Sequence, residues 1–408
     1  MSFRSKIRGW LAYFYDVPWC VPPWGWEEFV ATMGCLASGR VVTGPAPKRF
    51  AEAVAKYLGM PYALPFNFGR VAIEVALRAM DVSTADEVVL PSYLGWTVLA
   101  AVNRVGARAV FADVGPDLHV TAETIGRVLT AKTKCVIVPH LFGNVAPIDE
   151  IEESLKGSGV HLIDSAAQSF GARRAGRLVG TFGTWGIISC GPGKALAGSA
   201  GGLLVTRDRQ LYERAAALVA GRESRWTVTS RVLSCWVWRR LRRYTLPSRL
   251  ALIRLFDLGD KARQYEARAM SNIDGAIALE LLRKLCRSIK HRRRNASALL
   301  AALGPLRACS ISDFSDASTV LKLVLLLPEN GPKAKEATQF LARAGIECHA
   351  GYRPLHMGGA EACRPLANTE ALWDRVIWLP VDTPLKDSRR LQALAQTWSE
   401  RLPGREDL

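Results

Sequence analysis

Short apolar runs alternate with amphipathic stretches along the first half of the chain. A short apolar run is typical of a buried strand, and apolar positions three and four residues apart are typical of a helix with one buried face. Alternation of the two predicts a mostly parallel sheet that helices cover on both faces. The pattern predicts strands over 87–91, 107–113, 135–139 and 160–164, and helices over 71–80, 97–105, 122–129 and 148–155.

The second half predicts a smaller α/β domain. At 408 residues the chain is long for a single core. We expect a large domain with its N-terminal segment over 1–220, an insert over 221–265, and a linking helix with a small domain over 266–408. Within that last part we predict helices over 270–303, 333–344 (ended by Gly345) and 391–402, and strands over 319–327 and 346–349.

The net charge of +17 favours contact with something anionic. Arginines concentrate between residues 222 and 263, interleaved with tryptophans and aliphatic residues. This mixture suits a helix at the surface of an anionic membrane. It also suits a helical hairpin packed on the chain's own core or on a partner subunit, so both interpretations stay open. No recognisable nucleic-acid-binding module accompanies the charge, and we expect no nucleic-acid partner.

The nine cysteines are scattered and form no C-x-x-C pair. They are typical of reduced thiols in a cytoplasmic protein, and we predict no metal site. No apolar stretch reaches the roughly 18 residues of a transmembrane helix. We therefore expect a cytoplasmic protein, with membrane association through 222–263 as the open alternative.

One group of residues carries candidate chemistry. Lys194 ends a run that begins at Ser189, and a glycine cluster follows it. Upstream, the apolar run 160–163 ends in Asp164. An acid at the end of a buried strand can keep a pyridine nitrogen protonated, and a lysine can bind an aldehyde as a Schiff base. A serine with small-residue backbone can hold a phosphate. These are the parts that a pyridoxal-phosphate enzyme needs.

The order of the motifs resembles that of the DegT/StrS-type sugar aminotransferases, a branch of the fold-type I pyridoxal-phosphate enzymes. The resemblance covers nearly the whole chain, and it implies a large domain with a mostly parallel seven-stranded sheet and a smaller C-terminal α/β domain. It is carried by residues 38–39, 43–44, 68–72, 86–93, 138–143, 166–172, 176–180, 189–194, 200–202, 270–273, 345–347, 352–356 and 379–381.

The resemblance also implies residue roles. Lys194 would hold the cofactor and carry the proton, and Gln168 would lie beside the 3′-oxygen of the ring. Ser189 would bind the phosphate together with the backbone of Gly69 and Arg70. The family is dimeric, with each site lined by both subunits, so we expect a homodimer.

Among the departures from the family pattern, two concern residues that would contact the cofactor ring. Counting back from Lys194, the aspartate that faces the ring nitrogen falls on Ser165, with Asp164 one place earlier. Neighbours on a strand face opposite ways. Either a bulge turns Asp164 inward, or the nitrogen lacks its acid; of the two, we predict Asp164 as the acid. The ring-stacking aromatic falls on Gly95, and we predict Trp96, which flanks it, as a cofactor contact.

The leading hypothesis is a pyridoxal-phosphate-dependent aminotransferase. By resemblance it would move an amino group from glutamate to a keto-sugar, linked to a nucleotide, in cell-surface polysaccharide or secondary-metabolite synthesis. Lys194 argues against the dehydratase branch of the family, where a histidine replaces that lysine. Two alternatives stay open: a lipid-linked or hydrophobic ketone as substrate at the membrane, and a non-catalytic regulatory relative.

Overall fold

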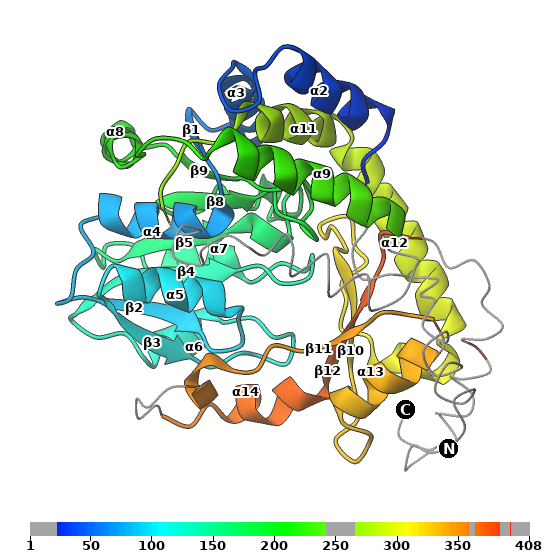
Figure 1. The fold of residues 1–408 in the computed structure, drawn as a ribbon. Helices are drawn as coiled ribbons and strands as arrows, with labels where there is room; N and C mark the ends of the chain where they lie inside the picture. The colour runs from blue at the N-terminus through cyan, green and yellow to red at the C-terminus, as the bar shows by residue number, and fades with distance from the viewer. Residues whose placement is uncertain (1–22, 242–265, 344, 359–363, 384–391, 393–408) are drawn as a thin grey trace.

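The structure of the chain, a computed structural model, describes residues 23–241, 266–343, 345–358, 364–383 and 392 (Figure 1). The final predicted helix, 391–402, lies outside the described residues except for residue 392, and so does most of the second half of the predicted insert. In the described part of the chain, no helix is long and apolar enough to cross a membrane.

A seven-stranded sheet forms the centre of the large domain. β9 runs antiparallel to both β1 and β8, and the remaining neighbours pair in parallel. The predicted mostly parallel sheet is therefore confirmed. In spatial order the strands are β1 (Tyr62–Phe66), β9 (Gly202–Thr206), β8 (Trp185–Ser189), β5 (His161–Ser165), β4 (Thr133–Pro139), β2 (Glu87–Pro91) and β3 (Arg108–Ala112).

Helices connect and cover these strands. The middle strands β2 and β4 are almost wholly buried, as expected for a sheet covered on both faces. Figure 1 shows α4 and α5 in front of the sheet. The helices of this domain are α4 (Gly69–Ala79), α5 (Trp96–Arg104), α6 (Ala122–Gly126), α7 (Ile148–Ser154) and α8 (Arg209–Ala217), and a small hairpin is formed by β6 (Arg173–Arg174) and β7 (Arg177–Leu178).

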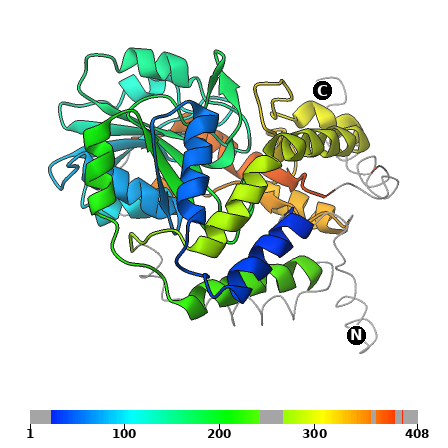
Figure 2. The ribbon, with the colours of Figure 1, turned by 90° about the horizontal axis from the view of Figure 1, so that it is seen from above.

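A second helical layer lies over the β1–β9 end of the sheet. α2 (Trp26–Ala37) and α3 (Ala46–Leu58) pack on α11 (Asn272–Arg283). α9 (Arg225–Leu241) lies beside α2 in Figure 2, and the rings of Phe29 and Trp236 meet between the two helices. Trp24 is fully buried under this layer and donates its indole N–H to the carbonyl of Ala197 at 2.8 Å. The N-terminal helices are therefore fixed to the loop that contains Lys194.

The small domain is built on a three-stranded antiparallel sheet in the order β10 (Lys322–Leu326), β12 (Val376–Pro380), β11 (His349–Ala350). Its helices are α12 (Leu285–Ala302), α13 (Ala334–Arg343) and α14 (Ala367–Leu372). Gly345 follows α13 with a φ of 82°, the left-handed conformation expected of a glycine that ends a helix.

Several element boundaries differ from the predictions. The predicted helix 270–303 is two helices, because Lys284 leaves helical geometry there and pairs with Glu27 and Glu28 of α2. The helix predicted over 122–129 ends at Gly126, and the strand predicted over 346–349 is the short β11. The sequence analysis predicted neither of the strands β8 and β9, which flank Lys194, and it missed α2, α3 and β12. The predicted division at residues 220 and 265 stays a prediction.

Gly143 joins the two domains. It follows β4 with a φ of 102°, and a Cβ atom there would lie 2.3 Å from the backbone nitrogen of Leu321. Its carbonyl accepts hydrogen bonds from the Thr319 N–H at 3.1 Å and the Ser318 hydroxyl at 2.9 Å. Only glycine satisfies both the backbone conformation and the close approach of the small domain.

We expect Gly143→Ala to lower the free energy of unfolding by about 2–4 kcal/mol, through backbone strain and overpacking. Urea denaturation measures the change. Gly126→Ala is the control, because no atom lies within 4 Å of its Cβ position. Equal stability of the two variants would contradict this account of the domain junction.

Candidate active site

Lys194 lies on the loop between β8 and β9. The loop is closed at its base by the Cys190 N–H, which donates to the Gly201 carbonyl at 2.9 Å. Gly193 has a φ of 77°, and the Lys194 N–H closes the turn on the Gly191 carbonyl at 3.2 Å. From α12, the Arg292 side chain donates to the Lys194 carbonyl at 3.3 Å. The backbone of Lys194 is therefore fixed from both domains.

The Lys194 amine has a lower pKa than an ordinary lysine. Burial, with a smaller effect from the positive charge of Lys322, lowers the pKa of Lys194 to about 8. Among the residues that the structure describes, no hydrogen bond or ion pair reaches this amine. Above pH 8 more than half of it is therefore the neutral, nucleophilic form, which can attack a carbonyl carbon.

The N-terminus of α4 meets the β8–β9 hairpin closely. A Cβ atom on Gly69, the first residue of α4, would lie 2.9 Å from the Ser189 Oγ, and one on Gly202 would lie 2.4 Å from the Gly69 Cα. The first N–H groups of a helix have no partners within the helix and attract an anion. The structure thus brings together the predicted residues Gly69, Arg70 and Ser189 at a helix N-terminus that fits a phosphate.

Two arginines lie against the ring of Phe68, the residue before α4. The Arg70 guanidinium is 4.8 Å from the ring centroid and the Arg231 guanidinium is 5.4 Å from it. Arg231 comes from α9, in the basic segment for which the sequence analysis left open a membrane surface or packing on the chain's own core or a partner subunit. Its neighbours on α9, Val228 and Val232, are buried, so the inner face of this helix packs on the chain's own core.

A buried charge network holds Arg231. Its guanidinium pairs with Glu223 at 2.8 Å and with Asp274 at 2.7 Å, and Ser271 donates to Asp274 at 2.5 Å. Burial opposes the charge, but the two carboxylates outweigh it and raise the pKa of Arg231. The network joins α9 to the start of α11, beside the Phe68 ring.

Gln168 is fixed between the two domains. Its Oε1 accepts from the Phe142 N–H at 3.1 Å, and its Nε2 donates to the Tyr352 hydroxyl at 3.3 Å. Tyr352 stacks on Phe142 with ring centroids 5.9 Å apart, and its ring edge is 3.9 Å from the Cβ position of Gly95. An aromatic ring from the small domain therefore lies beside the position where the family aromatic is missing. The sequence analysis quoted Tyr352 in a motif without giving it a role.

Trp96 lies at the first position of α5 with 60% of its surface exposed. Tyr93, the other aromatic that flanks Gly95, is fully buried instead. The contact between Trp96 and a cofactor stays a prediction.

Asp164 lies in a closed set of hydrogen bonds. One carboxylate oxygen accepts from the Gly180 N–H at 2.6 Å and the Phe182 N–H at 3.1 Å. The other pairs with the His140 Nε2 at 2.9 Å. His140 Nδ1 accepts from the Ala146 N–H at 3.0 Å, so Nε2 carries the proton that His140 donates.

The bulge that the sequence analysis required is absent. β5 pairs with β4 and with β8 in an unbroken register through both Asp164 and Ser165. The alternation of side chains along β5 is therefore preserved, and the expectation that a bulge turns Asp164 inward is corrected. That Asp164 contacts the cofactor stays a prediction.

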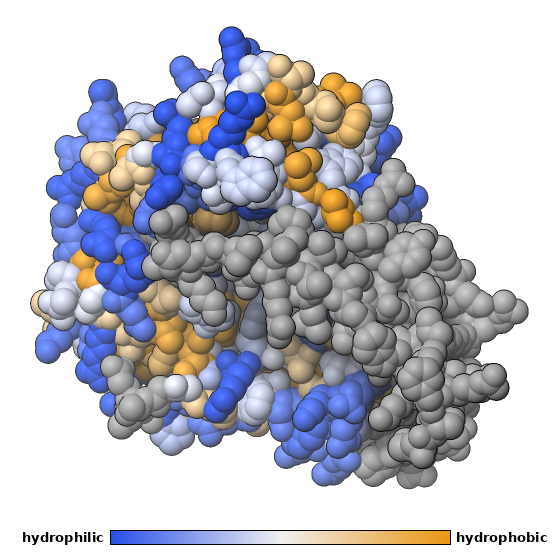
Figure 3. Space-filling view, in the orientation of Figure 1, coloured by the Kyte–Doolittle hydropathy of each residue, from blue (hydrophilic) through white to orange (hydrophobic). Residues whose placement is uncertain are grey.

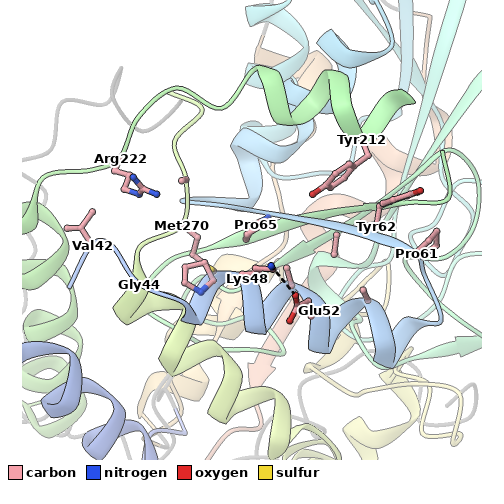
Figure 4. A pocket seen from close by; sticks show the side chains of 15 residues that line it. Val42, Gly44, Lys48, Glu52, Pro61, Tyr62, Pro65, Tyr212, Arg222 and Met270 are labelled. Atoms are coloured by element: carbon pink, nitrogen blue, oxygen red, sulfur yellow. Dashed lines mark ion pairs between the residues drawn. The ribbon is translucent and has the colours of Figure 1, made fainter. Parts of the chain in front are cut away.

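A separate cleft of about 430 Å³ opens on the outer side of β1 (Figure 4). Tyr62 and Tyr212 stack along one wall with ring centroids 5.1 Å apart, and Arg222 and Met270 lie at the other end. A Cβ atom on Gly201 would touch the Met270 methyl group, so Met270 separates this cleft from the loop of Lys194.

The residues around Lys194 fit pyridoxal phosphate. The glycine-lined helix N-terminus offers a place for the phosphate, and the unpartnered amine of Lys194 offers a place for the aldehyde carbon. Among the described residues, no group of three or more potential metal ligands lies together.

Comparison with known proteins supports this interpretation. Residues 25–393 match the model of the DegT/DnrJ/EryC1/StrS aminotransferase family. The chain is 31% identical over 352 residues to the L-glutamine:2-deoxy-scyllo-inosose aminotransferase of Streptomyces fradiae, in an alignment that covers 83% of this chain and 78% of that protein.

Solved structures share the fold. The aminotransferase TlmJ of Streptoalloteichus hindustanus superposes with a TM-score of 0.76 at 24% identity, covering 94% of this chain and 98% of that one. A GDP-4-keto-6-deoxymannose-3-dehydratase with a trapped PLP-glutamate geminal diamine superposes with a TM-score of 0.75 at 22% identity, covering 94% of this chain and all of that one. The predicted fold class and family are both confirmed: this chain belongs to the DegT/DnrJ/EryC1/StrS aminotransferase family.

Proposed function

We propose that this chain uses pyridoxal phosphate to transfer an amino group to the keto group of a sugar or sugar-like ring. The observation that carries the proposal is the placement of Lys194, an amine with a pKa of about 8 and no partner among the described residues, on a loop closed against the N-terminus of α4. When bound, the cofactor supplies the electron sink for breaking the bond to the amino donor's α-hydrogen. Lys194 binds its aldehyde carbon and then moves the proton, while Ser189 and the α4 backbone hold its phosphate.

The acceptor that we propose is a keto-sugar linked to a nucleotide, in polysaccharide or secondary-metabolite synthesis. The net charge of +17 and Arg70, at the start of α4, suit an anionic substrate. The Streptomyces fradiae relative is named for an uncharged cyclitol ketone and for L-glutamine as donor. Glutamate and glutamine are therefore both candidate donors, and a free cyclitol ketone is the second candidate acceptor.

The presence of Lys194 favours amino transfer over the dehydratase chemistry of the family. It also argues against a purely regulatory relative, because such a protein has no need of an unpartnered, partly desolvated amine. Burying a lysine without a partner costs free energy, and that cost is typical of a functional site. The scattered free thiols of the described cysteines agree with the proposed cytoplasmic location.

The direct test is the absorbance of the purified protein with pyridoxal phosphate, before and after L-glutamate or L-glutamine, measured above pH 8. We expect a visible cofactor band that either donor converts to the shorter-wavelength amine form, and an aminated product when a nucleotide-linked keto-sugar follows. Lys194→Ala should abolish the conversion.

Lys156→Ala, at an exposed lysine just after α7, should leave the conversion unchanged. A band that neither donor alters would contradict amino transfer. Conversion that survives in Lys194→Ala would contradict the role of Lys194.

We also propose a homodimer. Residues 270–273 resemble the start of the family's dimer helix, and Met270, the first of them, lies between the outer cleft of Figure 4 and the loop of Lys194. We expect sedimentation velocity to give twice the chain mass of 44.7 kDa at micromolar concentration. A species of single chain mass that is fully active would contradict a site shared between subunits.

A second role, contact with an anionic membrane surface, is favoured by one observation. Apolar side chains gather on the outer sides of α2 and α9 (Figure 3). The rings of Phe29 and Trp236 meet edge to face across the two helices, with centroids 5.8 Å apart. Trp26 and Trp226 are 72% and 80% exposed, and aromatic rings beside arginines suit the headgroup region. The other exposed members of this α2–α9 surface are Phe29, Val30, Met33, Leu233 and Val237.

We expect the protein to sediment with phosphatidylserine vesicles, to remain in solution with phosphatidylcholine vesicles, and to be released by high salt. Replacing Trp26 and Trp226 by alanine should weaken the binding to vesicles about thirtyfold, since each of the two buried rings contributes on the order of 1 kcal/mol. Leu218→Ala, at an exposed leucine after α8, is the control. Equal behaviour with both vesicle types would contradict the membrane contact.

A further inference from the structure

The pairing of β5 with β8 sorts their side chains onto two faces of the sheet. Asp164 is the partner of Gly186, and Ser165 is the partner of Ile187. Paired residues in a sheet share a face, and residues two apart along a strand share a face. Ser165, Ile187 and Ser189 therefore point to one side, and Asp164, Gly186 and Ile188 point to the other.

The face that holds Asp164 is closed by the loop before β8. A Cβ atom on Gly186 would lie 1.9 Å from the Gly180 carbonyl oxygen, so this loop touches the sheet itself. The N–H groups of Gly180 and Phe182 both donate hydrogen bonds to the Asp164 carboxylate. His140 fills the remaining side of the carboxylate. The carboxylate thus fastens the loop and β4 to β5.

The opposite face is the one with the anion site. Ser189 lies on it, and both its Cβ and its Oγ are 2.9 Å from the Cβ position of Gly69 at the start of α4. Gly202, the strand partner of Ser189, meets the Gly69 Cα on the same side. Ser165 shares this face, one strand further along the sheet, at the carboxyl end of β5. Ligands of open α/β sheets bind beyond the carboxyl ends of the strands.

The hydroxyl of Ser165 is free for a ligand. In the described part of the chain, no hydrogen bond involves its side chain. The Ser165 Oγ atom itself keeps some accessible surface, although the residue as a whole is 94% buried. A buried hydroxyl without a partner is uncommon, which makes it a candidate contact for a bound molecule.

We propose that Ser165, and not Asp164, faces the ring nitrogen of the cofactor, and that this nitrogen is unprotonated at neutral pH. The inference rests on the proposed function, since it requires bound pyridoxal phosphate. A hydroxyl donates one hydrogen bond to a neutral nitrogen and brings no charge. A carboxylate would instead favour the charged, protonated form. Ser165 thereby weakens the electron sink, and Asp164 acts as a positioning residue for the loop and the sheet.

The test is the nitrogen NMR spectrum of the protein loaded with ¹⁵N-labelled pyridoxal phosphate. We expect the ring nitrogen of the wild type to resonate at the position of an unprotonated pyridine. Ser165→Asp should move the resonance upfield to the protonated position. Ser165→Ala should leave it unprotonated, because it removes only the hydrogen-bond donor. Asp164→Asn should not move the resonance, although it should lower the unfolding temperature.

A protonated nitrogen in the wild type overturns the inference, and so does a resonance that stays in place in Ser165→Asp. If Asp164→Asn does not fold, the wild type and the two Ser165 variants still decide the matter. Uptake of the labelled cofactor is measured first. A wild type that takes up none overturns the proposed function as well, whereas uptake with a protonated nitrogen overturns this inference alone.

Discussion

The close approach of α4 to the β8–β9 hairpin is the constraint on which the site depends. Gly69 and Gly202 meet with no room for a Cβ atom on either, and Ser189 lies at the same junction. Because β8 leads directly into the loop of Lys194, this junction fixes the distance between the helix N-terminus and the amine. A larger residue at Gly69 or Gly202 would separate the two halves of the site while leaving most of the hydrophobic core unchanged.

Some of the chain's many arginines form ion pairs inside the molecule. Arg231 pairs with Glu223 and Asp274 next to the ring of Phe68, and Arg292 joins Asp382 to the carbonyl of Lys194. A buried pair adds little net stability, since desolvation opposes the attraction, but losing one partner leaves a costly buried charge. These pairs fix α9 and the small domain relative to the site. The outer side of α9 is left with its tryptophan, leucine and valine exposed.

Local patterns predicted the parallel half of the sheet, because β2, β4 and β5 are apolar runs of strand length bounded by turns. The sequence analysis did not predict β8 and β9: Gly186 interrupts β8 where the Gly180 loop meets the sheet, and β9 begins at Gly202, which meets α4. The roles of Lys194, Gly69 and Ser189 followed from resemblance, and the structure brings the last two together. The contacts of Arg231 and Tyr352 could not be predicted, because they join segments far apart in the chain. The face of the sheet on which Asp164 lies depends on strand register, which local sequence does not determine.

The central claim is that Lys194 holds the cofactor covalently. Reduction of the protein loaded with pyridoxal phosphate by borohydride, followed by digestion and mass spectrometry, locates the attached group. The account predicts one phosphopyridoxyl group per chain, on the peptide that contains Lys194. Attachment to another lysine, such as the buried Lys322 of the small domain, or no attachment at all, would contradict it.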